Sequence, residues 1–134
     1  MTSRPPAATV RILIADDHRR FAEALESMLE SEEQLEVVGR ADDGREAVEL
    51  ARTLEPDVVL LDISMPVMDG FEAAARISAL PTRTAVVMLT GSAAEQDVDR
   101  ARRAGARAYV TRDSIAARLV DAILEAAQPT GQPE

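Results

Sequence analysis

Side chains that could bind a metal ion or a phosphoryl group follow four separate apolar runs of this sequence. They are Asp16 and Asp17 after the first run, Asp62 after the third, Thr90 after the fourth and Arg112 after the fifth. Three carboxylates that lie close together repel one another unless a cation joins them. With no cysteine and a single histidine in the chain, we expect an all-oxygen ligand set, which favours Mg²⁺ before Ca²⁺. If the fold gathers these residues, they predict a magnesium site.

The same residues could transfer a phosphoryl group. A carboxylate held beside Mg²⁺ can attack phosphorus and form an acyl phosphate. The metal ion would offset the negative charge on the phosphoryl oxygens. Thr90 could donate a hydrogen bond to one of these oxygens, and Arg112 could pair with another.

The elements that must position these residues are indicated by the apolar pattern. Five runs predict strands: Val10–Ala15, Leu35–Val38, Val58–Leu61, Ala85–Leu89 and Ala108–Val110. Between and after them, apolar residues recur at helical spacing: Phe21, Leu25, Met28 and Leu29; Ala47, Val48, Ala51 and Leu54; Ala73, Ile77 and Leu80; Val98 and Ala101; Ile115, Leu119, Ile123 and Ala126. This alternation predicts an α/β fold with a doubly wound parallel sheet of five strands and five helices. In the flavodoxin-like strand order 2-1-3-4-5, the four polar-ended strands are neighbours, and ligands bind beyond their carboxyl ends.

The length and the net charge of the chain exclude several classes of protein. The 134 residues suffice for one domain with a sizeable core. A net charge of −9 argues against nucleic-acid binding, for which the chain also has no motif. No apolar run approaches the roughly 18 residues that span a bilayer, so we expect a cytoplasmic protein that does not bind membranes. We predict flexible tails over residues 1–9 and 128–134, the second being a tail or the start of a linker, and a folded domain over residues 10–127.

Four stretches carry a resemblance to a known family. They are Ile12–His18 (ILIADDH), Val59–Gly70 (VLLDISMPVMDG), Met88–Thr90 (MLT) and Ala104–Asp113 (AGARAYVTRD). In this order and spacing they resemble the receiver domain of bacterial two-component response regulators, over essentially Val10 to Ala127. The Asp-Asp-His sequence is similar to the subfamily that is usually fused to a LuxR-type helix-turn-helix.

The resemblance implies a role for each site residue. Asp62 matches the phosphoacceptor, which becomes an aspartyl phosphate. Asp16 and Asp17 match the acidic pair that holds Mg²⁺ together with Asp62, and the backbone carbonyl of Ser64 matches a further metal ligand. Thr90 matches the hydroxyl that moves toward the phosphoryl group.

The resemblance also implies a signalling switch. The phosphoryl donor would be a sensor histidine kinase or a histidine phosphotransfer protein in a phosphorelay. Tyr109 matches the aromatic residue that turns inward when the hydroxyl of Thr90 moves. The output would go to an unknown protein, to a C-terminal DNA-binding domain beyond this chain, or to a homodimer formed on phosphorylation. Such a phosphoprotein is not an enzyme, because it only phosphorylates and dephosphorylates itself.

One departure from the family keeps an alternative open. Arg112 stands where the family has lysine, and a planar guanidinium fork does not replace a compact ammonium group without consequence. The alternative is therefore an atypical, phosphorylation-independent receiver that acts as a protein-interaction module. An aspartate-dependent phosphohydrolase is less favoured, because Ser64 stands where such enzymes often place a second aspartate as general acid. A flavin module would need more than the three aromatic residues present.

Simpler structural roles compete with some of these assignments. Asp16 and Asp17 could cap the first helix, since aspartate is a favoured N-cap residue. Asp42 and Asp43 form a second acidic pair, but they follow an edge strand far from Asp62, so we interpret them as a helix cap. His18 is expected to face solvent.

Overall fold

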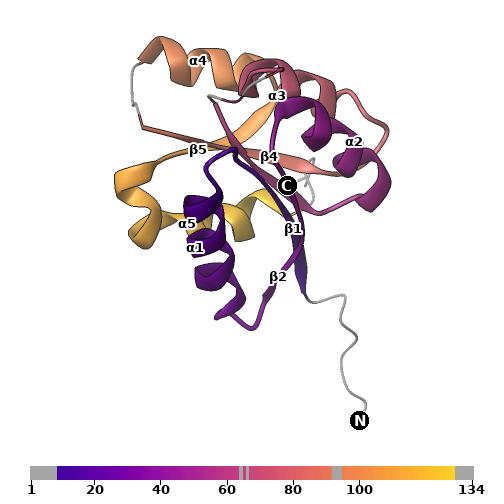
Figure 1. Ribbon diagram of the computed structural model, residues 1–134. Coiled ribbons are helices and arrows are strands. Elements are labelled where there is room, and N and C mark those ends of the chain that lie inside the picture. The colour runs from indigo at the N-terminus through magenta and orange to yellow at the C-terminus, as the bar shows by residue number, and fades with distance from the viewer. Residues whose placement is uncertain (1–8, 64, 66, 92–94, 129–134) are drawn as a thin grey trace.

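The computed structural model describes residues 9–63, 65, 67–91 and 95–128. Its strands and helices alternate along the chain (Figure 1). They are β1 (Val10–Ala15), α1 (Arg19–Glu30), β2 (Leu35–Ala41), α2 (Gly44–Leu54), β3 (Val58–Asp62), α3 (Gly70–Ser78), β4 (Ala85–Thr90), α4 (Glu95–Arg103), β5 (Ala106–Thr111) and α5 (Ile115–Ala126). A short 3₁₀ helix, Arg112–Ser114, joins β5 to α5.

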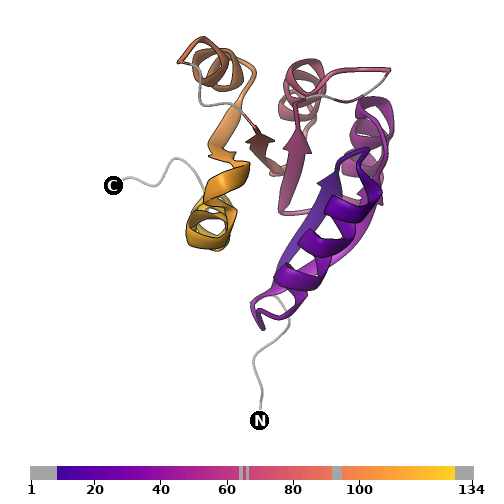
Figure 2. The same ribbon diagram turned by 60° about the vertical axis from the view of Figure 1, so that its left-hand side comes forward.

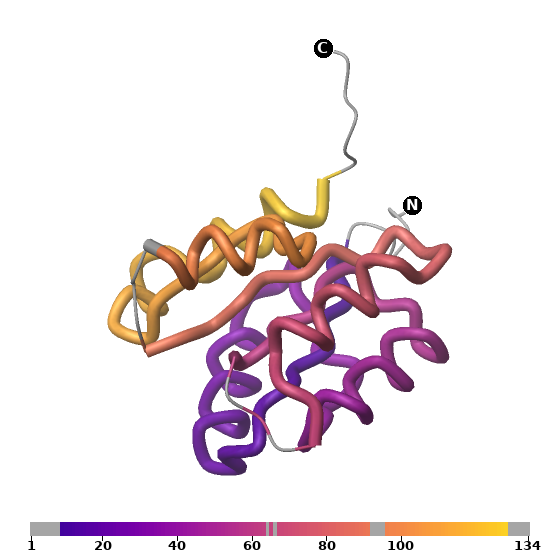
Figure 3. Tube along the Cα trace, turned by 90° about the horizontal axis from the view of Figure 1, so that it is seen from above, coloured from indigo at the N-terminus to yellow at the C-terminus, as the bar shows by residue number. Residues whose placement is uncertain are grey.

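The strands form one parallel sheet in the order β2-β1-β3-β4-β5. This confirms the predicted doubly wound, flavodoxin-like fold. The chain adds strands first on one side of β1 and then on the other, so the direction of winding reverses between β1 and β3. In sheets of this kind, ligands bind at the carboxyl end of such a reversal. Seen from above in Figure 3, the early purple segments lie on one side of the molecule and the late orange and yellow segments on the other.

Helices cover both faces of the sheet. Figures 1 and 2 show α1 and α5 on one face and α2, α3 and α4 on the other. In β1, Ile12 and Ile14 join the core beneath α1 and α5, whereas Leu13 and Ala15 join the core beneath the other three helices. All five residues of β3 are buried, as expected for a central strand covered on both faces.

Local signals in the sequence set several helix ends. The carboxylate of Asp43 accepts a hydrogen bond from the backbone N–H of Glu46, at 2.8 Å, and so caps α2. This confirms the interpretation of the second acidic pair as a helix cap. After α4 the chain passes through Gly105, whose φ of +102° favours glycine. A Cβ at this position would lie 2.2 Å from the Oγ of Ser78, so the close approach of α3 also requires glycine.

The predicted edge strands are too short. β2 was expected to end at Val38 but continues to Ala41, and β5 was expected to span only Ala108–Val110 but runs from Ala106 to Thr111. Both strands lie at the edges of the sheet and are only partly buried, so their ends need no continuous apolar run. A search for apolar runs therefore misses these ends.

No helix in the described part of the chain has the length and apolar character needed to cross a membrane. The cytoplasmic location stays a prediction. The predicted flexible tails fall almost entirely outside the described residues, and their flexibility also stays a prediction.

Candidate functional site

The fold brings the predicted acidic residues to one edge of the sheet. Asp16 directly follows β1, and Asp62 and Thr90 are the last residues of β3 and β4. β3 lies between β1 and β4, and Thr90 stands one residue beyond Leu89, the register partner of Asp62. Parallel strands of similar length therefore place all three side chains at their common carboxyl end.

The three carboxylates lie close enough to share one cation. One oxygen from each of Asp16, Asp17 and Asp62, together with a nitrogen of His18, lies within 4.8 Å of the others. Asp16 and Asp62 are each only 2% exposed, whereas Asp17 is at the surface. Buried carboxylates are costly unless positive charge or hydrogen bonds compensate them.

The chemistry of these donors fits Mg²⁺. The Oδ2 of Asp16 is buried and has no hydrogen-bond partner among the described residues. A hard divalent cation would give this oxygen a partner and would offset the repulsion between the carboxylates. The predicted carbonyl ligand, Ser64, lies outside the described residues.

His18 reaches further into the site than expected. Its side chain is 58% exposed, in keeping with the predicted solvent-facing position. Its Nδ1, however, lies 3.1 Å from the Oδ1 of Asp16 and 3.2 Å from the Oδ1 of Asp17. The backbone N–H of His18 also donates to the Oδ1 of Asp16, at 2.8 Å. The N-cap residue of α1 is His18, and no side chain caps this helix, so the alternative that Asp16 or Asp17 caps it is wrong. Asp16 instead closes the turn before α1 with one oxygen while the other lies in the pocket.

Arg112 lies in the same pocket. It belongs to the 3₁₀ helix after β5, and its side chain reaches beyond β4 toward β3 and β1. Its Nη2 lies 3.1 Å from the Oδ1 of Asp62 and 3.7 Å from the Oδ2 of Asp16. The Cζ of Arg112 lies 4.6 Å from the centre of the Phe21 ring on α1. The sequence pattern placed Phe21 only on the inner side of a helix and gave no signal for this stacking.

Thr90 and Tyr109 lie on neighbouring strands near this pocket. Thr90 is 7% exposed and pairs in register with Thr111, two residues after Tyr109 on β5. Tyr109 is half-buried and packs against the core beneath α2, α3 and α4. The structure therefore places the predicted hydroxyl within the acidic edge and the predicted aromatic residue on the adjoining edge strand.

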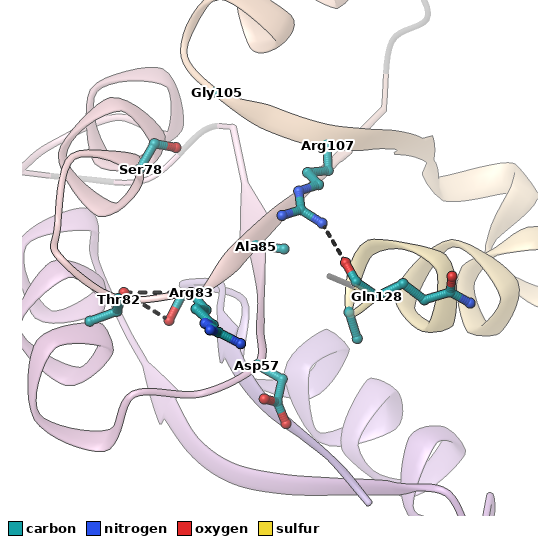
Figure 4. Close-up of a pocket in the computed structure, with 10 residues that line it drawn as sticks. Asp57, Ser78, Thr82, Arg83, Ala85, Gly105, Arg107 and Gln128 are labelled. Atoms are coloured by element: carbon teal, nitrogen blue, oxygen red, sulfur yellow. Dashed lines mark hydrogen bonds between the residues drawn. The ribbon is translucent and has the colours of Figure 1, made fainter. Parts of the chain in front are cut away.

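A hollow in the surface lies at the opposite end of the sheet, where the strands begin. Its volume is about 600 Å³, and it is lined by residues at the amino ends of β3, β4 and β5 and at the ends of α3 and α5 (Figure 4). One of its side chains already has a structural role: the Nη1 of Arg107 donates to the backbone carbonyls of Ala126 and Gln128, at 2.7 and 3.0 Å. These bonds satisfy carbonyls at the end of α5. Asp16, Asp17 and Asp62 are not among the residues that line this hollow.

The fold and the site together define a class of protein, a doubly wound, flavodoxin-like domain with a cluster of carboxylates at the carboxyl ends of its central strands. Comparison with known proteins identifies the family within this class. The response regulator receiver domain family matches residues 12–124. The chain therefore belongs to the receiver domains of two-component response regulators, which confirms the resemblance seen in the sequence.

Several relatives support this assignment. The chain is 38% identical over 125 residues to the transcriptional regulatory protein LiaR of Bacillus subtilis, covering 93% of this chain but only 58% of LiaR. The solved receiver domain of NarL from Mycobacterium tuberculosis is 36% identical with a TM-score of 0.85, covering 89% of this chain and 96% of that one. Solved LuxR-family regulators are also similar, in agreement with the predicted subfamily.

A further solved structure is relevant to the chemistry. The solved complex of CheX with CheY, BeF₃ and Mg²⁺ from Borrelia burgdorferi contains a chain that is 25% identical, with a TM-score of 0.82 and coverage of 92% of this chain and 98% of that one.

Proposed function

We propose that this receiver domain accepts a phosphoryl group on Asp62 from a sensor histidine kinase or a histidine phosphotransfer protein. The observation that carries the proposal is the position of Asp62. Its carboxylate lies at the buried end of β3, in one cluster with Asp16 and Asp17 and 3.1 Å from the guanidinium of Arg112. This is the arrangement of anionic nucleophile and positive charge that phosphoryl transfer to a carboxylate requires.

The metal ligands follow from the donors present. Asp16, Asp17, Asp62 and the backbone carbonyl of Ser64 would hold Mg²⁺. When bound, Mg²⁺ would offset charge on the phosphoryl oxygens. Receiver domains generally bind Mg²⁺ at an acidic pocket, and the CheY complex named above contains Mg²⁺ with BeF₃.

The chemical step uses the side chains already described. A carboxylate oxygen of Asp62 attacks phosphorus, and the bond between phosphorus and the donor nitrogen breaks. The electron pair of that bond stays with the donor imidazole, which takes up a proton from solvent, and an acyl phosphate forms on Asp62. Arg112 pairs with one phosphoryl oxygen, and the hydroxyl of Thr90 donates to another. Hydrolysis restores Asp62, so the domain acts as a phosphoacceptor switch and not as an enzyme with a separate substrate.

The signal would pass from Thr90 to Tyr109. Movement of the Thr90 hydroxyl toward the phosphoryl group would free space near the end of β4, and the ring of the half-buried Tyr109 would turn inward. The chain spans 58% of the length of LiaR. An output activity like that of such longer relatives is therefore only proposed for this chain. The outputs we propose are an effector protein, a DNA-binding domain or a homodimer formed on phosphorylation.

Phosphorylation by a small donor tests this function. The purified protein is incubated with Mg²⁺ and acetyl phosphate, and its intact mass is measured beside that of Asp62→Asn. We expect the wild type to gain one phosphoryl group and the variant to gain none. No gain with acetyl phosphate or with a phosphorylated histidine donor, in a correctly folded protein, would overturn the proposal in favour of the phosphorylation-independent module.

A further inference from the structure

The guanidinium of Arg112 is held between an acidic group and an aromatic ring. On one side, Nη2 lies 3.1 Å from the Oδ1 of Asp62. On the other, Cζ lies 4.6 Å from the centre of the Phe21 ring, within the range of a cation–π interaction. These three residues come from β3, α1 and the connection between β5 and α5, so the contact joins distant parts of the chain.

An arginine in this position needs something to orient it. Its side chain is long and loses considerable rotamer freedom when it is fixed in one geometry. The Nε of Arg112 is buried and has no hydrogen-bond partner among the described residues, so this atom does not fix the plane of the guanidinium. The Cζ of the guanidinium instead lies over an aromatic ring, a contact that a planar cation makes well.

Phe21 is suited to act as this support. It is half-buried and packs against the core beneath α1 and α5. The helix that carries it is anchored by Ala22 and Leu25, each 3% exposed. The ring therefore contacts both the core and the guanidinium of Arg112.

We propose that Phe21 is a positioning residue, whose ring holds the guanidinium of Arg112 toward Asp62 so that it meets the phosphoryl oxygens. This inference rests on the proposed phosphoryl transfer to Asp62. It also explains how an arginine can serve at the position where the family has lysine. An ammonium group has no plane to be oriented, so dependence on Phe21 is expected to belong to arginine and to disappear with lysine.

A double-mutant cycle tests the inference. Binding of beryllofluoride, a mimic of the phosphoryl group, is measured in the presence of Mg²⁺ through the backbone amide signal of Thr90 in nuclear magnetic resonance spectra. We expect Phe21→Leu to weaken binding about three- to tenfold, because a partly buried cation–π contact is lost. Phe21→Tyr, which keeps the aromatic face, should restore binding to within about twofold of the wild type. In the Arg112→Lys background, Phe21→Leu should change binding less than about twofold.

A second stacked pair supplies a matched control. Arg100 of α4 lies over Phe71 of α3, with its Cζ 4.2 Å from the ring centre, and neither residue contributes to the acidic cluster. Phe71→Leu makes the same side-chain change as Phe21→Leu. Its effect on beryllofluoride binding should be the same in the wild-type and Arg112→Lys backgrounds.

The outcomes separate this inference from the proposed function. Absence of beryllofluoride binding by the wild type would overturn the proposed function and, with it, the role of Phe21. If the wild type binds normally and Phe21→Leu weakens binding equally in the wild-type and Arg112→Lys backgrounds, then Phe21 only packs the helix. That result would overturn the positioning role alone.

The stack itself has a readout that does not depend on phosphoryl chemistry. The Nε–H proton of Arg112 should be shifted upfield by the ring in the wild type and in Phe21→Tyr, and should lose this shift in Phe21→Leu. An unshifted proton in the wild type would also overturn the inference.

Discussion

The two carboxylate oxygens of Asp16 make different contacts. Its Oδ1 accepts the backbone N–H of His18, while its Oδ2 faces Arg112 at 3.7 Å. Asparagine can keep the first interaction but cannot supply the charge that a cation needs. At the scale of single residues, the change Asp16→Asn would therefore remove the charge from the predicted metal site and keep the hydrogen bond that closes the turn.

Asp16→Asn should therefore fold normally but lose its response to Mg²⁺. Removing one of two buried neighbouring carboxylates relieves repulsion, so its thermal midpoint without Mg²⁺ should equal or exceed that of the wild type. At Mg²⁺ tenfold above its dissociation constant, mass action should stabilise the wild type by about 1.4 kcal/mol. The variant should show almost none of this gain in thermal unfolding. A full Mg²⁺-dependent gain in Asp16→Asn would contradict the assigned ligand set.

His18 competes with a cation for the same oxygens. Its Nδ1 lies 3.1 and 3.2 Å from oxygens of Asp16 and Asp17 and must give way when Mg²⁺ binds there. Because the side chain is 58% exposed, the interaction is screened by solvent and worth little. We expect His18→Ala to tighten Mg²⁺ binding about two- to fivefold. A titration followed by nuclear magnetic resonance would check this, and weaker binding would indicate that His18 assists the ion instead.

At the scale of elements, the end of β3 depends on its contact with the start of α3. A Cβ added at Gly70 would lie 2.4 Å from the carbonyl oxygen of Asp62 and 2.7 Å from the Cα of Ile63. Both atoms belong to backbone and cannot swing aside. The small residue at the start of α3 thus lets the strand that carries Asp62 end where it does.

Gly70→Ala should lower the free energy of unfolding by about 1–3 kcal/mol, the usual range for overpacking, and should slow phosphorylation by acetyl phosphate. Urea denaturation measures the first effect. Gly91→Ala is the matched control, because an added Cβ there meets no atom within 4 Å, and its stability should stay within about 0.5 kcal/mol of the wild type. Equal stability of the two variants would refute the close-approach argument.

How well the sequence predicts the bounds of a strand depends on how deeply that strand is buried. β3 is buried along its whole length, so its continuous apolar run marked it almost to the residue. β2 contains Gly39 and Arg40 near its end, which no apolar run includes, and its pairing with β1 shifts register between Ile12 and Leu13. Edge strands that are partly exposed leave a weaker trace in sequence than central ones.

At the scale of the whole molecule, chemistry and stabilising contacts lie at opposite ends of the sheet. The acidic cluster stands beyond the carboxyl ends of the strands, whereas Arg107 binds the end of α5 near the amino ends of the strands. Variants near the amino ends should therefore change stability without changing phosphoryl transfer.

Arg107→Ala tests this separation. The variant loses two hydrogen bonds from a charged group to the carbonyls of Ala126 and Gln128. Because Arg107 is exposed and water competes for these bonds, we expect a loss of about 1 kcal/mol in the free energy of unfolding, as for an ordinary hydrogen bond. The rate of phosphorylation by acetyl phosphate should stay unchanged. A slower rate at full folding would show that the two ends of the molecule are coupled.

The whole site was only partly predictable from the sequence. Asp16, Asp17, Asp62 and Thr90 stand at or just beyond the carboxyl ends of strands, so the parallel topology alone brings them together. The stacking of Phe21 on Arg112 joins α1 to the segment before α5, and no local pattern marks a contact between two such distant residues. The approach of His18 to the carboxylates depends on the turn into α1, which hydropathy does not encode.

The most direct test of the central claim is the identity of the residue that carries the phosphoryl group. The protein is phosphorylated with acetyl phosphate and Mg²⁺, the acyl phosphate is reduced with borohydride, and the resulting peptides are sequenced by mass spectrometry. Reduction of an aspartyl phosphate leaves homoserine, which we expect at position 62 and nowhere else. Homoserine at Asp16 or Asp17, or an unmodified Asp62 in phosphorylated protein, would contradict the account.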